Sequence, residues 1–309
     1  MKQLKILFLV LIGVLVSTTF TSCGSDDEPN MPSEDELYQQ WLEDATAQYD
    51  VVKDGMAYYI QEGSARLMSV NPAISGAVTI PSEVYYEGTG KSYPVTFVEF
   101  SPTPEYSNVT ALTIPSSVED CRVIYANHIK TLSIPSSVEY LEITCCEELA
   151  TVNLSEGLDN FGISDCPKIS TVKIPESVTQ FRFQKLNIKE ATVPSTVEAI
   201  QFRECEQLEV VHNLENSLIT ALSSRAFFNC KSLKEITLPK TLRYIYYGCC
   251  EGCSSLSNVH ILSTTPPSLR DANYGMPFTV MDNLYVPKGC KEAYKEVYPW
   301  SEFKEIIEE

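Results

Sequence analysis

A seven-residue phrase that recurs about every 20 residues constrains the fold of this chain more than any other feature. It reads apolar, polar, apolar, proline, two small or charged residues, and then valine or leucine. The copies are Leu112–Val118, Leu132–Val138, Val172–Val178 and Ile236–Leu242, a shortened copy at Thr192–Val197, and Val152–Leu158 with Ser155 in place of proline. Because chance does not produce a phrase that recurs in register, the chain must repeat one structural unit.

The second apolar residue of each phrase, its anchor, gives the length of the repeat. The anchors Ile114, Ile134, Leu154, Ile174 and Val193 are 20, 20, 20 and 19 residues apart; a lapsed copy near Leu214 follows after 21, then Leu238 after 24 and Ile261 after 23. Valine or leucine stands four residues past most anchors, and cysteine twelve past several. This period predicts a mainly β repeat solenoid, in which each coil buries its apolar side chains against the next.

The second half of the repeat resembles that of a known family. Arg225–Leu233, with the letters R-A-F-F-N-C-K-S-L, is the nearest copy of the A-F-x-x-C element of BspA-like leucine-rich repeats. The resemblance covers about residues 77–282 and implies a right-handed coil stack of 20–24-residue repeats in a bacterial surface lipoprotein of Bacteroidetes type. The A-F element is lost at Ile124–Ala126 and Phe183–Lys185, so the face that it builds is expected to differ.

Two segments are expected to cap the ends of the solenoid, which itself spans residues 109–282. Residues 49–108 indicate an N-terminal β cap and a first coil, beginning with a hairpin over Val51–Ile60 whose turn is Asp54-Gly55. Residues 283–309 indicate a C-terminal cap with a short helix. There, apolar side chains recur at helical spacing at Tyr294, Val297, Trp300, Phe303 and Ile306.

Residues 1–22 are predicted to be a signal peptide and not part of the fold. Lys2 and Lys5 precede an apolar run, Ile6–Val16, that is too short to span a bilayer. Phe20-Thr21-Ser22-Cys23 resembles the lipobox of bacterial lipoproteins, although Phe20 stands where leucine is usual. The resemblance implies that Cys23 becomes the first mature residue and carries a lipid anchored in the outer membrane. The alternative is an ordinary signal peptide followed by a chance cysteine.

Residues 23–48 are expected to form an acidic tether. Gly24–Glu28 cannot pack, and it resembles the export signal that sends lipoproteins of Bacteroidetes to the outer face of the outer membrane. A plain solvated tether is the alternative. Ser33 and Glu36 have the spacing of a capping box, which predicts a short helix over residues 34–47.

The charge balance excludes two classes of partner. The chain has 41 acidic and 23 basic residues and a net charge of −18, which becomes −20 when Lys2 and Lys5 leave with the signal peptide. A chain this acidic is not expected to bind nucleic acid or an anionic membrane through its overall charge.

The register of the cysteines argues against a disulfide framework. One repeat position is occupied by Cys146, Cys166, Cys205, Cys230 and Cys253. Their side chains should stack as a buried ladder, and aligned side chains are poorly directed for a disulfide. We therefore expect mostly free thiols, with an occasional bridge left open among Cys121, Cys145, Cys249, Cys250 and Cys290.

Residues for catalysis or metal binding are not evident. Cys250 and Cys253 form a C-x-x-C pair, but a zinc finger needs a second pair, and a redox pair needs a βαβ unit. The three histidines, His128, His212 and His260, fall in different coils. Serine-hydrolase, metalloprotease and P-loop motifs do not occur. The sequence therefore predicts a protein without catalytic activity, metal or cofactor.

What a solenoid offers is surface. Between the buried residues of the first strand the outward positions are Thr113, Ser133, Asn153, Lys173, Thr192, Thr237 and His260, and on a second extended face they are Arg122, Glu142, Gly162, Arg182, Gln201 and Tyr246. The first set is small and polar and suits hydrogen bonding across a broad, shallow sheet. The candidate ligand-binding residues are Ser133, Asn153, Lys173, Thr192, Thr237, His260, Arg182 and Tyr246. A merely solvated face is the alternative.

These observations predict a cell-surface lipoprotein that binds a protein or glycan partner through its solenoid. The adhesive role is implied by the family resemblance, since BspA-like proteins are associated with adhesion to host matrix proteins and other bacteria. A second hypothesis is a structural or accessory outer-membrane lipoprotein of a surface nutrient-uptake complex. Both hypotheses leave the identity of the ligand open.

Overall fold

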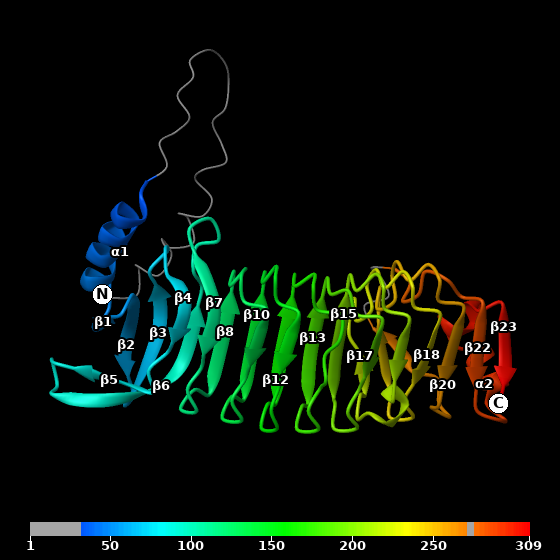
Figure 1. Cartoon of the computed structure of the whole chain (residues 1–309). Coiled ribbons are helices and arrows are strands. Elements are labelled where there is room, and N and C mark those ends of the chain that lie inside the picture. The colour runs from blue at the N-terminus through cyan, green and yellow to red at the C-terminus, as the bar shows by residue number, and fades with distance from the viewer. Residues whose placement is uncertain (1–31, 271–274) are drawn as a thin grey trace, which may run out of the picture. The chain divides into compact units, whose positions relative to one another are not determined.

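The repeated phrase folds into coils that lie side by side along one axis (Figure 1). The computed structural model describes residues 32–270 and 275–309, and Glu34–Glu309 forms one unit. The mainly β repeat solenoid that the periodicity predicts is confirmed. The predicted signal peptide, Cys23 and the acidic stretch Gly24–Glu28 lie outside the described residues. Within the described part of the chain, no helix is long and apolar enough to cross a membrane.

One face of the solenoid is a ten-stranded sheet, called here the long sheet. Its strands lie in the order β1 (Val51–Lys53), β2 (Met56–Gln61), β3 (Ser64–Val70), β6 (Lys91–Phe100), β8 (Asp120–Ile124), β10 (Tyr140–Thr144), β12 (Asn160–Ser164), β13 (Gln180–Gln184) and β15 (Ala199–Arg203), and β5 (Glu83–Tyr86) pairs only with β6. From β3 to β15 neighbouring strands are parallel. Side chains alternate between the core and the outside, so equivalent residues of successive coils form straight rows.

The opposite face is built from shorter pieces. Its sheets are β4 (Ser75–Thr79) with β7 (Asn108–Thr113), β9 (Thr131–Ser133) with β11 (Thr151–Asn153), β14 (Glu190–Thr192) with β16 (Val210–His212), and β18 (Glu235–Leu238) with β20 (Asn258–Ile261), β22 (Asn283–Val286) and β23 (Glu305–Glu308). The expectation of one broad sheet on this face is wrong. The breaks fall between β7 and β9, where the step is a regular 20 residues, between β11 and β14, across the coil of Lys173, and between β16 and β18, across the 24-residue step from Leu214 to Leu238.

The long sheet ends at β15, and a separate sheet takes its repeat position in the later coils. This sheet contains β17 (Ala221–Leu222), β19 (Tyr244–Tyr246) and β21 (Ser268–Arg270), all parallel. The longer coil before β18 also contains the 3-10 helix η1 (Leu214–Asn216). This longer coil therefore divides the array into an early part with the long sheet and a late part with the three-stranded sheet.

The hydroxyl residue of the repeated phrase links each turn to the coil before it. Ser137 donates its hydroxyl to the carbonyl of Val118 (2.7 Å), Ser177 to that of Leu158 (2.8 Å), and Thr241 to that of Ile219 (2.7 Å). Each bond satisfies a backbone carbonyl at the corner of the stack, where a strand ladder cannot. This explains why serine or threonine recurs immediately before the buried valine or leucine.

One turn departs from this pattern and depends on glycine. After β11 the phrase has Ser155 in place of proline, and Gly157 occupies the position of the hydroxyl residue with φ of +108°. A Cβ added to Gly157 would lie 2.4 Å from the backbone oxygen of Ser136 in the preceding coil. No larger residue fits there without movement of the backbone, because both the torsion angle and the space require glycine.

The core is one continuous cluster that runs through the stack, and the cysteine ladder is part of it. Cys146, Cys166, Cys205, Cys230 and Cys253 are all buried, as the register predicts. The thiols of Cys230 and Cys253 donate to carbonyls of the preceding coils (2.9 Å each), and burial raises the pKa of the Cys205 thiol to about 11. The ten cysteines from Cys121 to Cys290 are free thiols in the structure.

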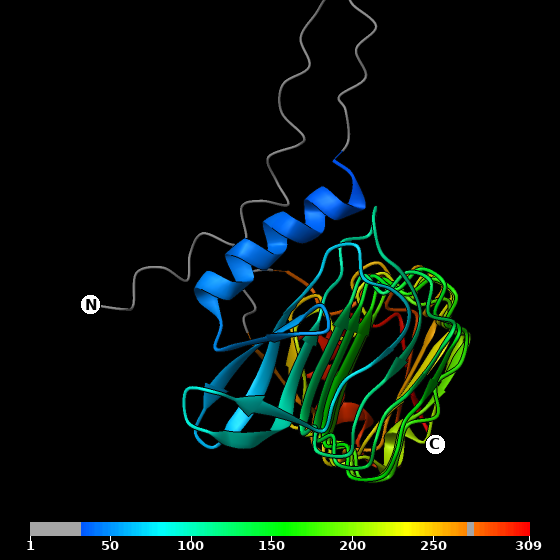
Figure 2. The same cartoon turned by 60° about the vertical axis from the view of Figure 1, so that its left-hand side comes forward.

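The predicted helix is present as α1 (Glu34–Gln48), but it does not belong to a tether. Trp41 and Ala45 of α1 pack against Ala57 of β2, and the Trp41 indole donates to the Ser69 hydroxyl (2.9 Å). The expected tether over residues 23–48 therefore includes a helix that packs on the first strands, and Figure 2 shows α1 beside them. The predicted hairpin at Asp54-Gly55 is confirmed, with positive φ at both residues.

The predicted C-terminal helix is only partly correct. Helix α2 (Lys291–Lys295) is short, the 3-10 helix η3 covers Trp300–Glu302, and Ile306 lies in β23, which pairs with β22. Pro299 interrupts the helical spacing because it lacks an N–H and disfavours helix at the residue before it. The apolar side chains of this segment are nevertheless largely buried, so helical spacing identified core residues but not their secondary structure. The role of the two end segments as caps stays a prediction.

Candidate functional site

The outward side of the long sheet carries an unbroken row of aligned positions, which we call the outer ladder. Its members come from successive coils and pair directly with one another: Glu99, Arg122, Glu142, Gly162, Arg182 and Gln201. All but Glu99 had been identified from the sequence as outward positions of the second extended face, and the structure confirms that they form one row. The ladder presents positively charged, negatively charged and amide side chains along a regular parallel sheet.

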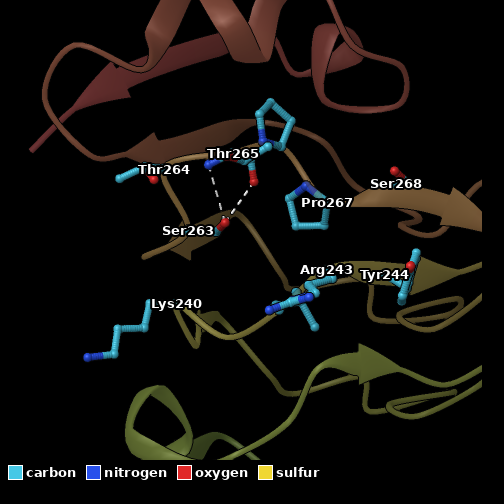
Figure 3. Close-up of a pocket in the computed structure, with 10 residues that line it drawn as sticks. Lys240, Arg243, Tyr244, Ser263, Thr264, Thr265, Pro267 and Ser268 are labelled. Carbon is cyan, nitrogen blue, oxygen red and sulfur yellow. Dashed lines mark hydrogen bonds between the residues drawn. The ribbon is translucent and has the colours of Figure 1, made fainter.

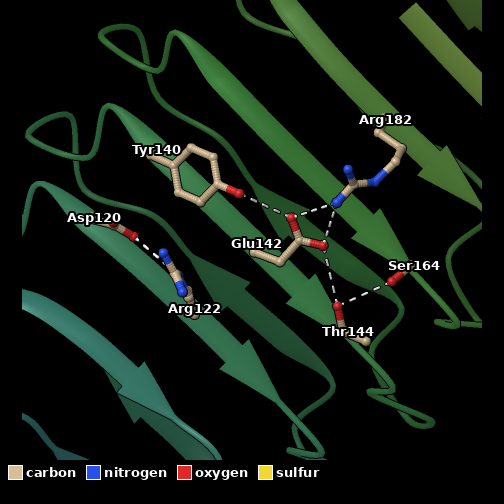
Figure 4. Close-up of polar contacts among 7 residues, drawn as sticks. All are labelled: Asp120, Arg122, Tyr140, Glu142, Thr144, Ser164 and Arg182. Carbon is tan, nitrogen blue, oxygen red and sulfur yellow. Dashed lines mark hydrogen bonds and ion pairs between the residues drawn. The ribbon is translucent and has the colours of Figure 1, made fainter. Parts of the chain in front are cut away.

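The central contact of the outer ladder spans two coil steps. Arg182 of β13 reaches over β12 and donates from one terminal nitrogen to both carboxylate oxygens of Glu142 in β10, at 2.9 Å each (Figure 4). Gly162 lies directly between them, and a Cβ there would approach the Glu142 carboxylate to 2.6 Å and the Arg182 guanidinium to 3.0 Å. The absence of a side chain at Gly162 is what allows the pair to form.

Hydroxyl groups surround the Glu142 carboxylate. Thr144 donates to one of its oxygens at 3.4 Å, Tyr140 lies 3.5 Å from the other, and Thr144 and Ser164 are 3.1 Å apart (Figure 4). Glu142 is therefore mostly covered, whereas 43% of the Arg182 side chain remains exposed. The carboxylate holds the arginine in place while the guanidinium keeps donors available to a partner.

A second arginine of the ladder lies on aromatic rings. The Arg122 guanidinium is 5.1 Å from the centre of the Phe97 ring and 5.8 Å from that of Tyr140, and it lies within 4.0 Å of the carboxylates of Glu99 and Asp120. Burial raises the pKa of the Asp120 carboxyl, and the nearby arginines oppose that shift. Cation–π contact and two carboxylates thus orient Arg122 with 40% of its side chain exposed.

A second row of outward residues lies beside the outer ladder, and the sequence pattern had not identified it. Phe97, Asp120, Tyr140, Asn160 and Gln180 also point outward, because they lie two residues from ladder members on the same strands. Phe97 is nevertheless buried, since the guanidinium of Arg66 lies 3.8 Å from its ring centre. Strand periodicity could have identified this row, but not the coverage of an outward phenylalanine by arginines from two other strands.

On the opposite face the candidate residues do not form one site. Asn153 donates to Ser133 at 3.1 Å within the β9–β11 sheet, and Lys173 lies in a segment without strand structure. Thr192 pairs with His212, a position not selected from the sequence. Thr237 pairs with His260, whose ring stacks on Tyr285 with centres 4.2 Å apart and whose Nδ1 is 3.0 Å from Glu309. The candidates other than Lys173 thus pair with neighbours on their own small sheets, and these sheets are separate from one another.

Tyr246 lies at the repeat position of the outer ladder but on the separate sheet of the late coils. It pairs with Arg270 in the register of β19 and β21, and the Arg270 guanidinium covers the neighbouring Tyr244 ring at 4.3 Å. Tyr246 and Arg182 are therefore not on one continuous sheet. Of the eight candidate ligand-binding residues, only Arg182 belongs to the outer ladder itself.

The repeats that build this surface match a known family. Residues 104–184 and 178–298 match the family described as BspA type leucine-rich repeat region, in six copies. The chain belongs to this family. The resemblance drawn from Arg225–Leu233 is therefore confirmed, and the outer ladder lies largely within the matched repeats of this BspA-type protein. A comparison with curated proteins gives no match.

Solved structures of similar chains share low identity with this BspA-type protein. A leucine-rich repeat protein from Bacteroides ovatus is 19% identical, with a TM-score of 0.47 over 84% of this chain and 77% of that one. A leucine-rich cell surface protein from Faecalibacterium prausnitzii is 14% identical, with a TM-score of 0.34 over 79% and 96%. The pneumococcal vaccine antigen PcpA is 13% identical, with a TM-score of 0.31 over 84% and 98%. The family assignment rests on the repeat match, not on these likenesses.

Proposed function

We propose that this protein is a non-catalytic surface lipoprotein that binds a protein or glycan partner through the outer ladder. The observation that carries the proposal is the pair of half-exposed arginines, Arg122 and Arg182, held on a rigid parallel sheet by carboxylates and rings. Arginine and tyrosine are enriched among the residues that contribute most to interfaces. Side chains that are already oriented lose little conformational freedom when a partner binds.

The opposite face supports the proposal less well. Asn153 and Ser133 are already hydrogen-bonded to one another, His260 contacts Glu309, and the face is divided into four separate sheets. A partner that spans several coils would meet a regular row only on the long sheet. For this reason we assign the interface to the outer ladder and not to Ser133, Asn153, Lys173, Thr192, Thr237 and His260.

The test of binding uses two arginine substitutions and a charge-matched control. The double variant Arg122→Ala/Arg182→Ala is compared with Lys130→Ala/Lys189→Ala, since both lysines are exposed and lie away from the outer ladder. On an array of glycans and matrix proteins, the arginine variant should lose at least about tenfold in affinity for any ligand of the wild type, because central interface arginines contribute about 2 kcal/mol or more. Equal binding by both variants and the wild type would place the interface elsewhere.

The proposed anchor is a lipid on Cys23, which places the solenoid outside the outer membrane. Its support is the Phe20–Cys23 segment and the acidic stretch Gly24–Glu28 that follows it. Protease added to intact cells should remove the protein, and Cys23→Ala should release it from the membrane fraction. Protection from protease would contradict surface exposure. Purification with stoichiometric membrane partners would instead favour an accessory subunit of an uptake complex.

A further inference from the structure

An open pocket of about 370 Å³ lies at a corner of the late coils, away from the outer ladder. One wall is the turn after β18, with Lys240 and Arg243. The other is the segment Ser263–Ser268 of the next coil, and Figure 3 shows the two walls facing one another. The pocket is large enough to hold part of a small ligand while remaining open to solvent.

The pocket exists because this turn breaks the repeat. In the early coils and at Leu242, the residue four positions past the anchor is a buried valine or leucine that fills the corner. Four positions past Ile261 stands Thr265, which is exposed, and Pro266 and Pro267 lengthen the turn by one residue relative to Leu238–Ile245. The buried valine or leucine of those corners is replaced here by an exposed threonine.

The charge at this corner is reversed relative to the early coils. One repeat position is identified by its backbone N–H, which donates to the preceding coil. In the early coils this position holds Glu139, Asp159, Thr179 and Glu198, and in the late coils it holds Arg243 and then Ser268. The residue after the proline of the phrase changes in the same way. It is Lys240 in this coil, whereas in earlier coils it is Glu176 or a serine, Ser116, Ser136 or Ser195. Lys240 and Arg243 are the charged residues that line the pocket, and no ion pair is recorded for either among the described residues.

The far wall is held in place from beneath. The buried Tyr294 hydroxyl donates to the carbonyl of Ser263 (2.7 Å), and the buried Trp300 indole donates to that of Pro267 (2.8 Å). Ser263 also donates its hydroxyl to the carbonyl of Thr265 and accepts from the Thr265 N–H (Figure 3). The wall is thus fixed at both ends, and the hydroxyls of Thr264 and Ser268 lie at its rim.

We infer that this corner pocket binds a sulfate group of an acidic glycan. Lys240 and Arg243 bring two positive charges to this corner, and each can form a charge-assisted hydrogen bond with an oxyanion. Around them the lining is short, hydroxyl-bearing and proline-rich, which suits the hydroxyl groups and ring faces of sugars. An acidic peptide would present few hydroxyl groups to the four serine and threonine residues of this lining, whereas a glycan presents many. This site concerns a second surface and does not rest on binding through the outer ladder.

The experiment titrates the full chain with a sulfated heparin hexasaccharide, its desulfated counterpart, inorganic sulfate and a glutamate hexapeptide. Calorimetry compares the wild type with Lys240→Gln/Arg243→Gln and with the charge-matched control Lys130→Gln/Lys189→Gln. The pocket variant should bind the sulfated probe at least about tenfold more weakly, while the control keeps the wild-type affinity. Because both residues are exposed, the variants should keep the wild-type melting temperature, which is measured alongside.

Each other outcome contradicts a defined part of the inference. An equal loss in the control would mean that overall charge and not the pocket governs binding. Equal affinity for the desulfated probe, which keeps its carboxylates, would mean that sulfate is not the group recognised, and equal affinity for the peptide or for free sulfate would exclude a glycan preference. The Arg122→Ala/Arg182→Ala variant should bind the sulfated probe like the wild type, so that failure of the outer-ladder proposal and failure of this one are separate results.

Discussion

Replacing Phe202 by alanine is expected to lower the free energy of unfolding by about 3–5 kcal/mol. Phe202 is fully buried, and its ring centre lies 5.5 Å from that of Phe181, 5.6 Å from that of Phe183 and 5.4 Å from that of Phe227. These rings join the last strands of the long sheet to the first coil beyond it. Urea unfolding followed by circular dichroism measures the change.

The control for this prediction is Phe202→Leu, which retains most of the apolar volume and should cost only about 1–2 kcal/mol. Since coils in a solenoid contact only their neighbours, hydrogen exchange in Phe202→Ala should increase mainly between β13 and the coil of Phe227. A loss of less than about 1 kcal/mol, or faster exchange throughout the chain, would contradict this role for the aromatic cluster.

Replacing Gly157 by alanine is expected to lower the free energy of unfolding by at least about 2 kcal/mol. At φ of +108° an alanine is strained, and its Cβ would overlap the Ser136 carbonyl oxygen of the coil before. Because that oxygen belongs to the backbone, relief of the overlap requires the two coils to move apart. Thermal and urea unfolding measure the loss.

The matched control is Gly63→Ala. Gly63 also has a positive φ, +84°, but no atom lies within 4 Å of the position of an added Cβ. This variant carries the torsional penalty alone, about 1 kcal/mol. If both variants lost the same stability, the contact with Ser136 would contribute nothing, and only the conformation of Gly157 would matter.

Much of the candidate surface could be predicted because it depends on period-2 alternation. Once Leu141 and Ile143 are assigned to the core, Glu142 must point outward, and the 20-residue repeat places Arg122 and Arg182 in the same row. What could not be predicted is which of these side chains interact. The sequence identifies Gly162 as a gap in the row, but the contact of Arg182 with Glu142 across that gap depends on the spacing of three strands.

The predictions that were wrong all depend on contacts between segments that are distant in the sequence. The face that carries Lys173 and Thr192 is divided into separate sheets, although the phrase at Val172–Val178 matches its neighbours in the sequence. The C-terminal residues kept helical spacing, yet Ile306 pairs with β22 as a strand. Helix α1 was expected on local grounds, but its docking on Ala57 was not, because such contacts have no local signal.

The 20-residue phrase was sufficient by itself to determine the solenoid, the buried positions and the cysteine ladder. Each coil has the same neighbours at the same distance, so a pattern within one repeat specifies contacts between repeats. The tertiary structure alone decided where this regularity fails: the gap over Gly162, the contact at Gly157, the divided opposite face and the pocket beside Lys240. Those features arise where adjacent coils differ, and a difference between coils becomes a shape only when the coils are stacked.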